Sequence, residues 1–479
     1  MNAAVAARAV LMVAAVLLPV VIAFAGGGTT DTARAGFLAA ACLVAAGAAA
    51  TALRPWPAGR AARTVLAALA AFALLTGASH AWTSDPGGWL IQTELAGSYL
   101  ALAYAATVLT GADPRLGRLA PPVAAAGTVL VSGYALLARL LSDLVGAAQP
   151  ARSGGRLSAP LGYWNAEGAL AALGLVICVA LAADRTRSRP VRAAAVAATA
   201  PLAIAVQLSY SRGALVAATV GVLVVAARSS SRAALGRAAV CAGGTMIAAV
   251  LVTLPFAAAR RGPVPAADGW PLLLLLIAVA ALGFIAAWRL LAHRTERDDP
   301  LPLRARRLLP LVAALLTAGL IVTAVTGGTD NGRAGFGASG ERLTQLGSNR
   351  AEYWRVAAGQ LESRPLAGHG AGSFADAWLR ERTIDENVVN AHSLWLETGA
   401  ELGSAGLLLL LIAAGTVVTA RRSPATAAIG TVAAYATAAS VDWHWQIPAL
   451  TGIAIVQLGV LLGSSDQPAV RGAAPSNAG

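Results

Sequence analysis

The sequence is dominated by uninterrupted apolar segments, and these constrain the fold more than any other feature. A transmembrane helix needs about 20 consecutive, mostly apolar residues. Fourteen segments of this kind are present, at residues 8–25, 36–53, 62–79, 90–110, 120–141, 166–183, 191–209, 213–228, 238–258, 270–290, 308–326, 392–418, 425–441 and 447–463. Only 12% of the 479 residues are charged, against about 25% in soluble domains. We therefore predict an all-α, polytopic transmembrane helix bundle of about 12–14 spans.

The arginines fall in alternate loops and predict the orientation of the chain. All basic residues are arginine, and the net charge is +13. With the N-terminus inside, the inner loops contain Arg54, Arg60 and Arg63; Arg115 and Arg118; Arg185, Arg187, Arg189 and Arg192; Arg228, Arg232 and Arg237; Arg294, Arg297, Arg304, Arg306 and Arg307; and Arg421 and Arg422. Because cytoplasmic loops collect arginine, both termini are predicted to be cytoplasmic. The same rule explains the basic charge without nucleic acid, and we expect no nucleic-acid partner.

The three cysteines give no sign of a disulfide or a metal site. Cys42, Cys178 and Cys241 lie far apart within apolar segments, and we interpret them as thiols buried among packed helices. The first apolar segment lacks a persuasive cleavage site and is followed by further spans. We therefore interpret it as a helix rather than a signal peptide.

One connection is much longer than the others and divides the chain. We predict N-terminal spans in 1–145, central spans in 146–326, a partly helical extracytoplasmic loop in 327–391, C-terminal spans in 392–463 and a disordered tail in 464–479. Within the loop, the pattern of residues from Asn349 to Ser363 predicts an amphipathic helix that ends before Pro365. Its expected apolar side consists of Tyr353, Trp354, Val356, Ala357 and Leu361. Only the Gly-rich start of the loop, 327–340, is expected to be floppy.

Two arginine-bearing segments are candidates for binding an anion. Ser211 and Arg212 lie between two adjacent spans at the predicted outer surface, and Arg350 and Arg355 lie in the long loop. Arginine presents a planar fork of donors that suits phosphate. The alternatives are an Arg212 that snorkels to the outer surface and loop arginines that pair with loop acids.

A third segment opens the span after the loop with Asn390 and His392. An imidazole near the outer surface can exchange protons with a substrate. The alternative is a structural histidine that caps the helix. Glu397 and Glu401 follow one turn apart inside the predicted span, where carboxylates need partners.

Two further outer turns contain polar and aromatic residues. Asp442 and His444 lie between the last two predicted spans, and Tyr163 and Asn165 lead into the sixth. These side chains can orient a catalytic group, a substrate or a sugar. Their alternative interpretation is an aromatic belt at the membrane interface. The histidines on the outer side do not have the spacing of a zinc site, so we expect no metal.

Taken in order, these segments resemble the O-antigen ligase family, which also contains polymerases of lipid-linked polysaccharides. The resemblance covers about residues 150–460. It rests on Ser211-Arg212-Gly213, Arg350 with Trp354, Pro365, Gly368-His369-Gly370, Asn390-Ala391-His392-Ser393, Leu402 to Gly406, and Asp442 to Pro448. It implies the multi-helix fold of lipid-linked glycosyltransferases in the bacterial cytoplasmic membrane, with the active site facing outward.

The resemblance also implies a function. The donor would be a glycan on a polyprenyl diphosphate such as undecaprenyl diphosphate, and the acceptor a hydroxyl of a glycan or glycolipid, with no cofactor and no metal. Arg212, Arg350 and Arg355 would bind the diphosphate and His392 would act as general base, which predicts an inverting transfer. Ser211, Tyr163, Asn165, Asn390, Asp442 and His444 would support them. The alternatives are a polymerase of lipid-linked repeats and, from another class, a polysaccharide or small-molecule transporter. The sequence shows no inverted repeat, which argues against a transporter. Glu397 and Glu401 inside a predicted span argue for one.

Overall fold

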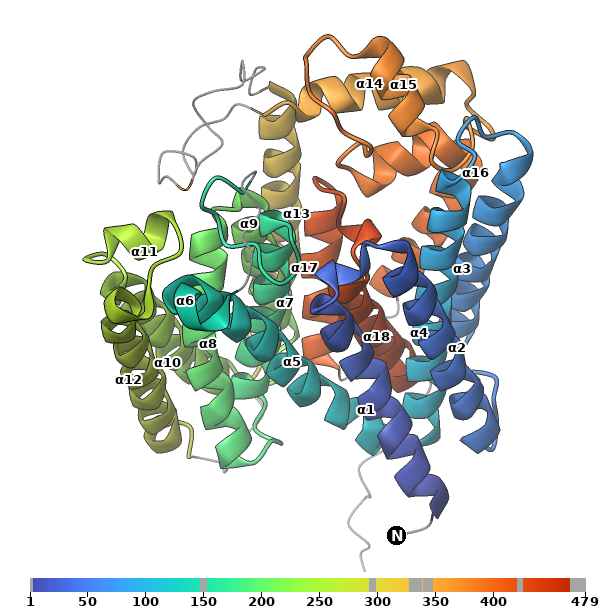
Figure 1. The fold of residues 1–479 in the computed structure, drawn as a ribbon. Helices are drawn as coiled ribbons and strands as arrows, with labels where there is room; N and C mark the ends of the chain where they lie inside the picture. Colours follow the sequence, from blue (N-terminus) through green and yellow to red (C-terminus); the bar gives the residue numbers. More distant parts are fainter. Residues whose placement is uncertain are drawn as a thin grey trace, which may run out of the picture.

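The computed structural model describes residues 3–146, 153–292, 299–326, 338, 348–419 and 425–465 (Figure 1). This part of the chain is helical, without a β-strand, and has one isolated bridge between Ser231 and Asp299. The longer helices are α1 (Ala3–Ala23), α2 (Asp31–Thr51), α3 (Arg60–Ala78), α4 (Gly88–Ala112), α5 (Pro114–Leu140), α7 (Trp164–Ala183), α8 (Arg189–Ser209), α9 (Arg212–Arg228), α10 (Arg232–Val252), α12 (Ala266–Leu290), α13 (Leu303–Thr326), α14 (Arg350–Ser363), α16 (Leu394–Thr419), α17 (Thr426–Ala439) and α18 (Pro448–Ser465). The shorter ones are η1 (Gly26–Gly28), η2 (Ser79–Ala81), α6 (Ser142–Val145), α11 (Ala257–Arg261), α15 (Phe374–Glu381) and η5 (His444–Gln446).

The predicted fold class is confirmed. Twelve helices of the described residues are long and apolar enough to cross a membrane, so the chain is a multi-pass membrane protein. Each of the fourteen predicted segments contains a helix, but two of these helices are shorter than the 18 residues used to identify a candidate span. α9 has 17 residues and α17 has 14. The apolar pattern runs on to residue 441, but α17 ends at Ala439 because the chain turns there towards Asp442.

The helices run alternately up and down, so every second connection lies at the same end of the bundle. The helices of the long loop, α14 and α15, lie at the end opposite the N-terminus (Figure 1). We call this end, with the turns at 153–163, 209–212 and 440–447, the loop end. The N-terminus of α1 and the connections α2–α3 and α4–α5 lie at the other end, which we call the N-terminal end.

α7 forms the centre of the bundle. Of its most apolar 18-residue window, 94% is buried, and it packs against α8, α9, α5 and α17. A Cβ atom at Gly168 would collide with Ser209, so the glycine allows α7 to approach the end of α8 closely. This contact brings the start of α7 beside the turn that contains Ser211.

The long loop is fixed to the bundle by a break in α16. Gly403 has φ 63°, and a Cβ there would collide with the carbonyl of Leu366. The Gly-rich turn after α14 packs against this break. The backbone N–H groups of His369 and Gly370 donate to the carbonyls of Ala400 and Glu401 at 3.0 and 2.7 Å. The loop is therefore hydrogen-bonded to the backbone of a membrane helix.

The predicted loop helix is present as α14. Tyr353, Trp354, Val356 and Ala357 are buried as expected, whereas Leu361 is half-buried and Gln360 is buried in its place. The Gly-rich start of the loop lies outside the described residues except for residue 338. α18 continues to Ser465, so the predicted tail lies outside them from residue 466 onward.

Candidate active site

Asp442 is the centre of a buried polar cluster at the loop end. It lies in the turn between α17 and η5 and is 3% exposed. The Tyr163 hydroxyl donates to its Oδ1 at 2.8 Å, and Asn165 Nδ2 donates to its Oδ2 at 2.7 Å. Arg350 Nη2 forms an ion pair with the same Oδ2 at 2.8 Å. Three segments far apart in the sequence thus meet on one carboxylate.

The ion pair between Arg350 and Asp442 fixes the charge of both groups. Arg350 is the first residue of α14, the helix that the loop packs over the bundle. Burial opposes both charges, but the arginine beside it lowers the pKa of Asp442, and the carboxylate in turn raises the pKa of Arg350. The pair is therefore fully ionised at neutral pH.

His392 lies beside this pair in an unusual backbone conformation. Its φ is 54°, in the left-handed region that non-glycine residues seldom occupy. Its Nδ1 is 3.0 Å from the carbonyl oxygen of Asn390, and its ring packs on Tyr353 with centroids 5.0 Å apart. Because a carbonyl only accepts, Nδ1 carries the proton and Nε2 has a free lone pair. Nε2 is 4.0 Å from Asp442 Oδ1.

The surroundings keep His392 neutral. Burial is the main cause, and it lowers the pKa of the imidazole together with the nearby Arg350, while Asp442 opposes the shift. A neutral imidazole whose lone pair faces the cluster can accept a proton. Once protonated, it would lie close to the Asp442 carboxylate, which stabilises the imidazolium.

His444 is the second histidine of the cluster. It is 3% exposed, and burial lowers its pKa to about 4. Its Nδ1 is buried and has no hydrogen-bond partner within the described part of the chain. A buried nitrogen without a partner is costly, so His444 is the second candidate base of the site.

Arg212, the predicted anion-binding residue between α8 and α9, lines a cavity beside Asp442. Its polar lining consists of Asn165, Ser211, Arg212, Thr323, Ser348, Arg350, Asp442 and His444. Ser211 caps α9 by accepting from the N–H of Ala214 at 3.2 Å, which places Arg212 at the start of that helix. Arg212 and Arg350 lie near enough to repel each other electrostatically. Two arginines on one cavity suit a ligand with more than one negative charge.

Two residues singled out in the sequence lie elsewhere. Arg355 points away from the cavity and hydrogen-bonds Glu352 at 3.0 Å and the carbonyl of Glu381 at 2.8 Å. This is the loop ion pair considered as its alternative, and it arises because position 355 is on another face of α14 from position 350. His369 forms a hydrogen bond with Ser363 at 2.7 Å and does not line the cavity. The histidine in the cavity lining is His444, and His392 lies beside the cavity through its approach to Asp442.

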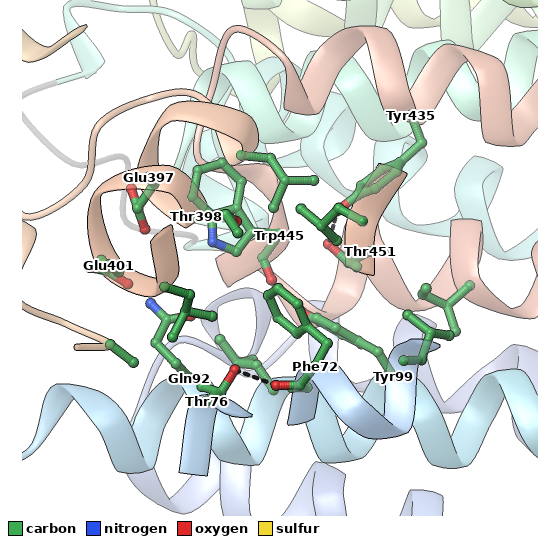
Figure 2. A pocket seen from close by; sticks show the side chains of 18 residues that line it. Phe72, Thr76, Gln92, Tyr99, Glu397, Thr398, Glu401, Tyr435, Trp445 and Thr451 are labelled. Carbon is green, nitrogen blue, oxygen red and sulfur yellow. Dashed lines mark hydrogen bonds between the residues drawn. The ribbon is translucent and has the colours of Figure 1, made fainter. Parts of the chain in front are cut away.

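The two glutamates of α16 fasten the loop. Glu397 accepts from the N–H of Ala391 at 2.6 Å and from Gln446 at 2.9 Å, and the side chain of Asn390 also bonds to it. Glu401 accepts from the N–H of Phe374 at 3.4 Å. Both also line an apolar cavity of about 140 Å³, which has Gln92, Thr398, Tyr435 and Thr451 on its wall (Figure 2). Buried carboxylates need hydrogen-bond partners of this kind. A role in holding the loop therefore explains Glu397 and Glu401 without an ion pathway.

Two neighbours of the cluster, Tyr353 and Asn349, could not be recognised from the sequence. Tyr353 was expected only on the apolar side of its helix, yet its ring supports His392 and its hydroxyl donates to Glu386 at 2.6 Å. Asn349 donates to the same carboxylate at 2.7 Å. The only available signal was that Glu386 precedes the Asn390–His392 segment by a few residues. No group of three or more His, Cys, Asp or Glu residues that could hold a metal occurs among the described residues.

Residues 271–411 match a family described as O-Antigen ligase. The match includes most of α12, all of α13, α14 and α15, and most of α16, and thus Arg350, Asn390 and His392. The other residues of the cluster lie outside the matched range: Tyr163, Asn165, Arg212, Asp442 and His444. No curated protein matches the chain.

Proposed function

We propose that this chain is a ligase-type membrane glycosyltransferase of lipid-linked glycans. The match of residues 271–411 to a family described as O-Antigen ligase supports this proposal. The donor is a glycan on a polyprenyl diphosphate, and the acceptor is a hydroxyl of a second glycan or glycolipid. The reaction takes place at the loop end, which faces outward from a bacterial cytoplasmic membrane. It needs neither a nucleotide sugar nor a metal.

In the proposed step, the acceptor oxygen attacks the anomeric carbon on the face opposite the diphosphate. His392 Nε2 takes the acceptor proton as the new C–O bond forms. The bond between the anomeric carbon and the diphosphate oxygen breaks, and its electron pair leaves with the diphosphate. The configuration at the anomeric carbon is inverted. Asp442, 4.0 Å from Nε2, balances the charge of the imidazolium.

Arg212 and Arg350 bind the leaving diphosphate. Negative charge develops on that group as the bond breaks, so donors arranged there beforehand lower the barrier. Arg350 is held by Asp442 through one terminal nitrogen at 2.8 Å. A guanidinium has five N–H donors, so it can contact phosphate without leaving Asp442. Ser211, Tyr163 and Asn165 position these charged groups.

The observation that carries the proposal is the shared carboxylate. Asp442 is close both to the arginine proposed to hold the leaving group and to the histidine proposed to take the proton. A snorkelling arginine, a capping histidine or an aromatic belt would not require these side chains to converge on one buried acid. Buried charges of this kind are costly and concentrate at functional sites.

Reconstituted transfer tests the reaction class. The purified full chain in proteoliposomes, without an ion gradient, is given a polyprenyl-diphosphate glycan and an acceptor glycolipid. We expect a covalent donor–acceptor product with inverted anomeric configuration, and no loss of rate in a chelator. Products that extend the donor glycan by repeats would identify a polymerase. Movement of glycan across the bilayer without a new bond would identify a transporter.

Cysteine labelling tests the orientation. In a background with the three native cysteines replaced by alanine, a cysteine is placed at Glu362, exposed at the loop end, or at Ser230, exposed at the N-terminal end. We expect a membrane-impermeant reagent to label only position 362 in intact cells. Labelling of position 230 alone would reverse the proposed orientation.

A further inference from the structure

A large apolar cavity extends along α16 between the two ends of the bundle. Its volume is about 830 Å³. One wall is α16, through Leu410 and Val417, and the opposite wall is formed by α9, α13 and α17, through Val224, Leu311 and Ala433. Sequence neighbours α16 and α17 flank this space because α16 packs against α3 and α14, whereas α17 packs against α9 and α7.

Two of the helices that line the cavity, α13 and α16, have a smaller buried share than any other candidate span. Of the apolar window, 11% is buried in α13 and 22% in α16, while the remaining ten spans bury 28% or more. The cavity is lined by apolar side chains over most of its length. Because lipid tails are as apolar as these walls, an open space of this kind between membrane helices suits lipid chains.

The two ends of the cavity differ in charge. At the N-terminal end it is lined by Arg228 at the end of α9 and by Arg306 and Arg307 at the start of α13. Arg306 donates to the carbonyl of Ala227 through Nε at 3.0 Å, so its terminal nitrogens are not used in that bond. Among the described residues, neither Arg306 nor Arg307 forms an ion pair with a carboxylate.

At the loop end, the same cavity is lined by Leu394 and Trp395, the first residues of α16. The positive charge is therefore confined to the end farthest from the cluster around Asp442. A lipid whose anionic head lies at Arg212 and Arg350 would place no phosphate beside Arg306 and Arg307. A lipid that enters from the other leaflet would match both the arginines and the apolar walls.

We propose that this cavity is a binding site for an anionic phospholipid of the leaflet at the N-terminal end. Its phosphate binds Arg306 and Arg307 beside Arg228, and its acyl chains lie between α16 and α13. Basic pockets between transmembrane helices recognise anionic headgroups in this way, and arginine holds phosphate by paired hydrogen bonds. This site does not depend on the proposed glycan transfer, and it supports the helix that begins beside His392.

Lipid retention by the purified full chain tests the site. The protein is placed in nanodiscs of phosphatidylcholine with a minority of phosphatidylglycerol, and retained lipids are counted by native mass spectrometry. We expect preferential retention of phosphatidylglycerol. In the Arg306→Gln/Arg307→Gln variant, its affinity should fall about fivefold for each arginine. Arg304→Gln, on the same helix end but outside the cavity lining, should leave retention unchanged.

A second pair of variants tests the acyl-chain part. Ala414→Phe fills the cavity from α16 and should reduce retention, whereas Leu408→Phe changes a lipid-exposed position of the same helix outside the lining and should not. Equal retention of the two phospholipids by the unaltered protein would overturn the proposal. The proposal would also be overturned if undecaprenyl diphosphate displaced phosphatidylglycerol and the double arginine variant had no effect on retention. The polyprenyl chain of the donor would then be the occupant of the cavity. Neither result bears on glycan transfer, which His392 variants test separately.

Discussion

Charged residues have opposite surroundings in two parts of the bundle: the α2–α3 and α4–α5 connections, and the cluster around Asp442. At the N-terminal end, Arg54, Arg60, Arg115 and Arg118 are exposed. At the loop end, Asp442 is buried with its ion-pair and hydrogen-bond partners around it. An exposed arginine costs little and mainly sets the orientation of the chain in the membrane. A buried charge has to be matched by partners, so its surroundings are specific to one geometry and suit chemistry.

The same contrast occurs within α14. The side chain of Arg350 is 21% exposed and bonded to Asp442, whereas that of Arg355 is 48% exposed and bonded to Glu352. Both arginines belong to one helix of one loop, and the sequence treats them alike. The comparison therefore gives a ranking of effects: residues of the buried cluster should matter greatly, and exposed residues at either end should matter little.

The largest effect is expected for the proposed base. His392→Ala should reduce the transfer rate by about 10²–10⁴-fold, the usual contribution of general-base catalysis, with donor binding largely kept. The measurement is the rate in proteoliposomes at saturating donor. His369→Ala is the matched control, because His369 lies at the same end but bonds Ser363. If His392→Ala stays active and His444→Ala does not, the base is His444; if all three survive, a carboxylate such as Asp442 becomes the candidate.

The next largest effect is expected for the two cavity arginines. Arg212→Lys and Arg350→Lys keep the positive charge but lose the planar fork. A lost charge-assisted hydrogen bond is worth about 1.5–3 kcal/mol, so each variant should reduce transfer about tenfold or more. Rate and donor affinity are measured for each. A near-normal rate for both would assign these arginines to snorkelling or structural pairing.

A smaller but specific effect is expected from pH. The pKa of His392 is lowered from its ordinary value of 6.5, so the imidazole stays neutral as the pH falls through that value. Transfer should therefore persist at pH 6.5 and be lost only at lower pH, when Nε2 becomes protonated. The rate is measured against pH for the unaltered protein and for His444→Asn. A loss centred above 6.5 would contradict a buried neutral base.

The smallest effect is expected at the exposed arginines. Arg355→Gln breaks an ion pair that is largely exposed, and such pairs contribute about 0–1 kcal/mol to stability. We expect the transfer rate to stay within about twofold of normal, with the melting temperature almost unchanged. Arg60→Gln is the matched variant at the other end. A large loss of donor affinity in Arg355→Gln alone would return this residue to the diphosphate site and weaken the contrast between buried and exposed charge.

Much of the site could be named from the sequence, but not assembled. Arg212, His392 and Asp442 stand out as polar residues at the ends of apolar segments, and Arg350 lies in the long loop. Alternation of the spans predicts that they share one end. Their convergence depends on the close contact at Gly168 and on the break at Gly403 that fixes the loop. Neither glycine differs in the sequence from the many others in these helices.

The sequence by itself predicted a helical membrane fold, a resemblance to the O-antigen ligase family and the candidate residues of the site, because hydropathy, loop charge and short motifs are local properties of the chain. The tertiary structure decided which arginine faces the cavity, that Tyr353 supports His392, and where α13 and α16 leave a space. α7 and α13 show why: their mean hydropathies are 2.2 and 2.4, yet 94% of one window and 11% of the other is buried. In a membrane, lipid and protein interior are both apolar, so only packing decides which helix faces which.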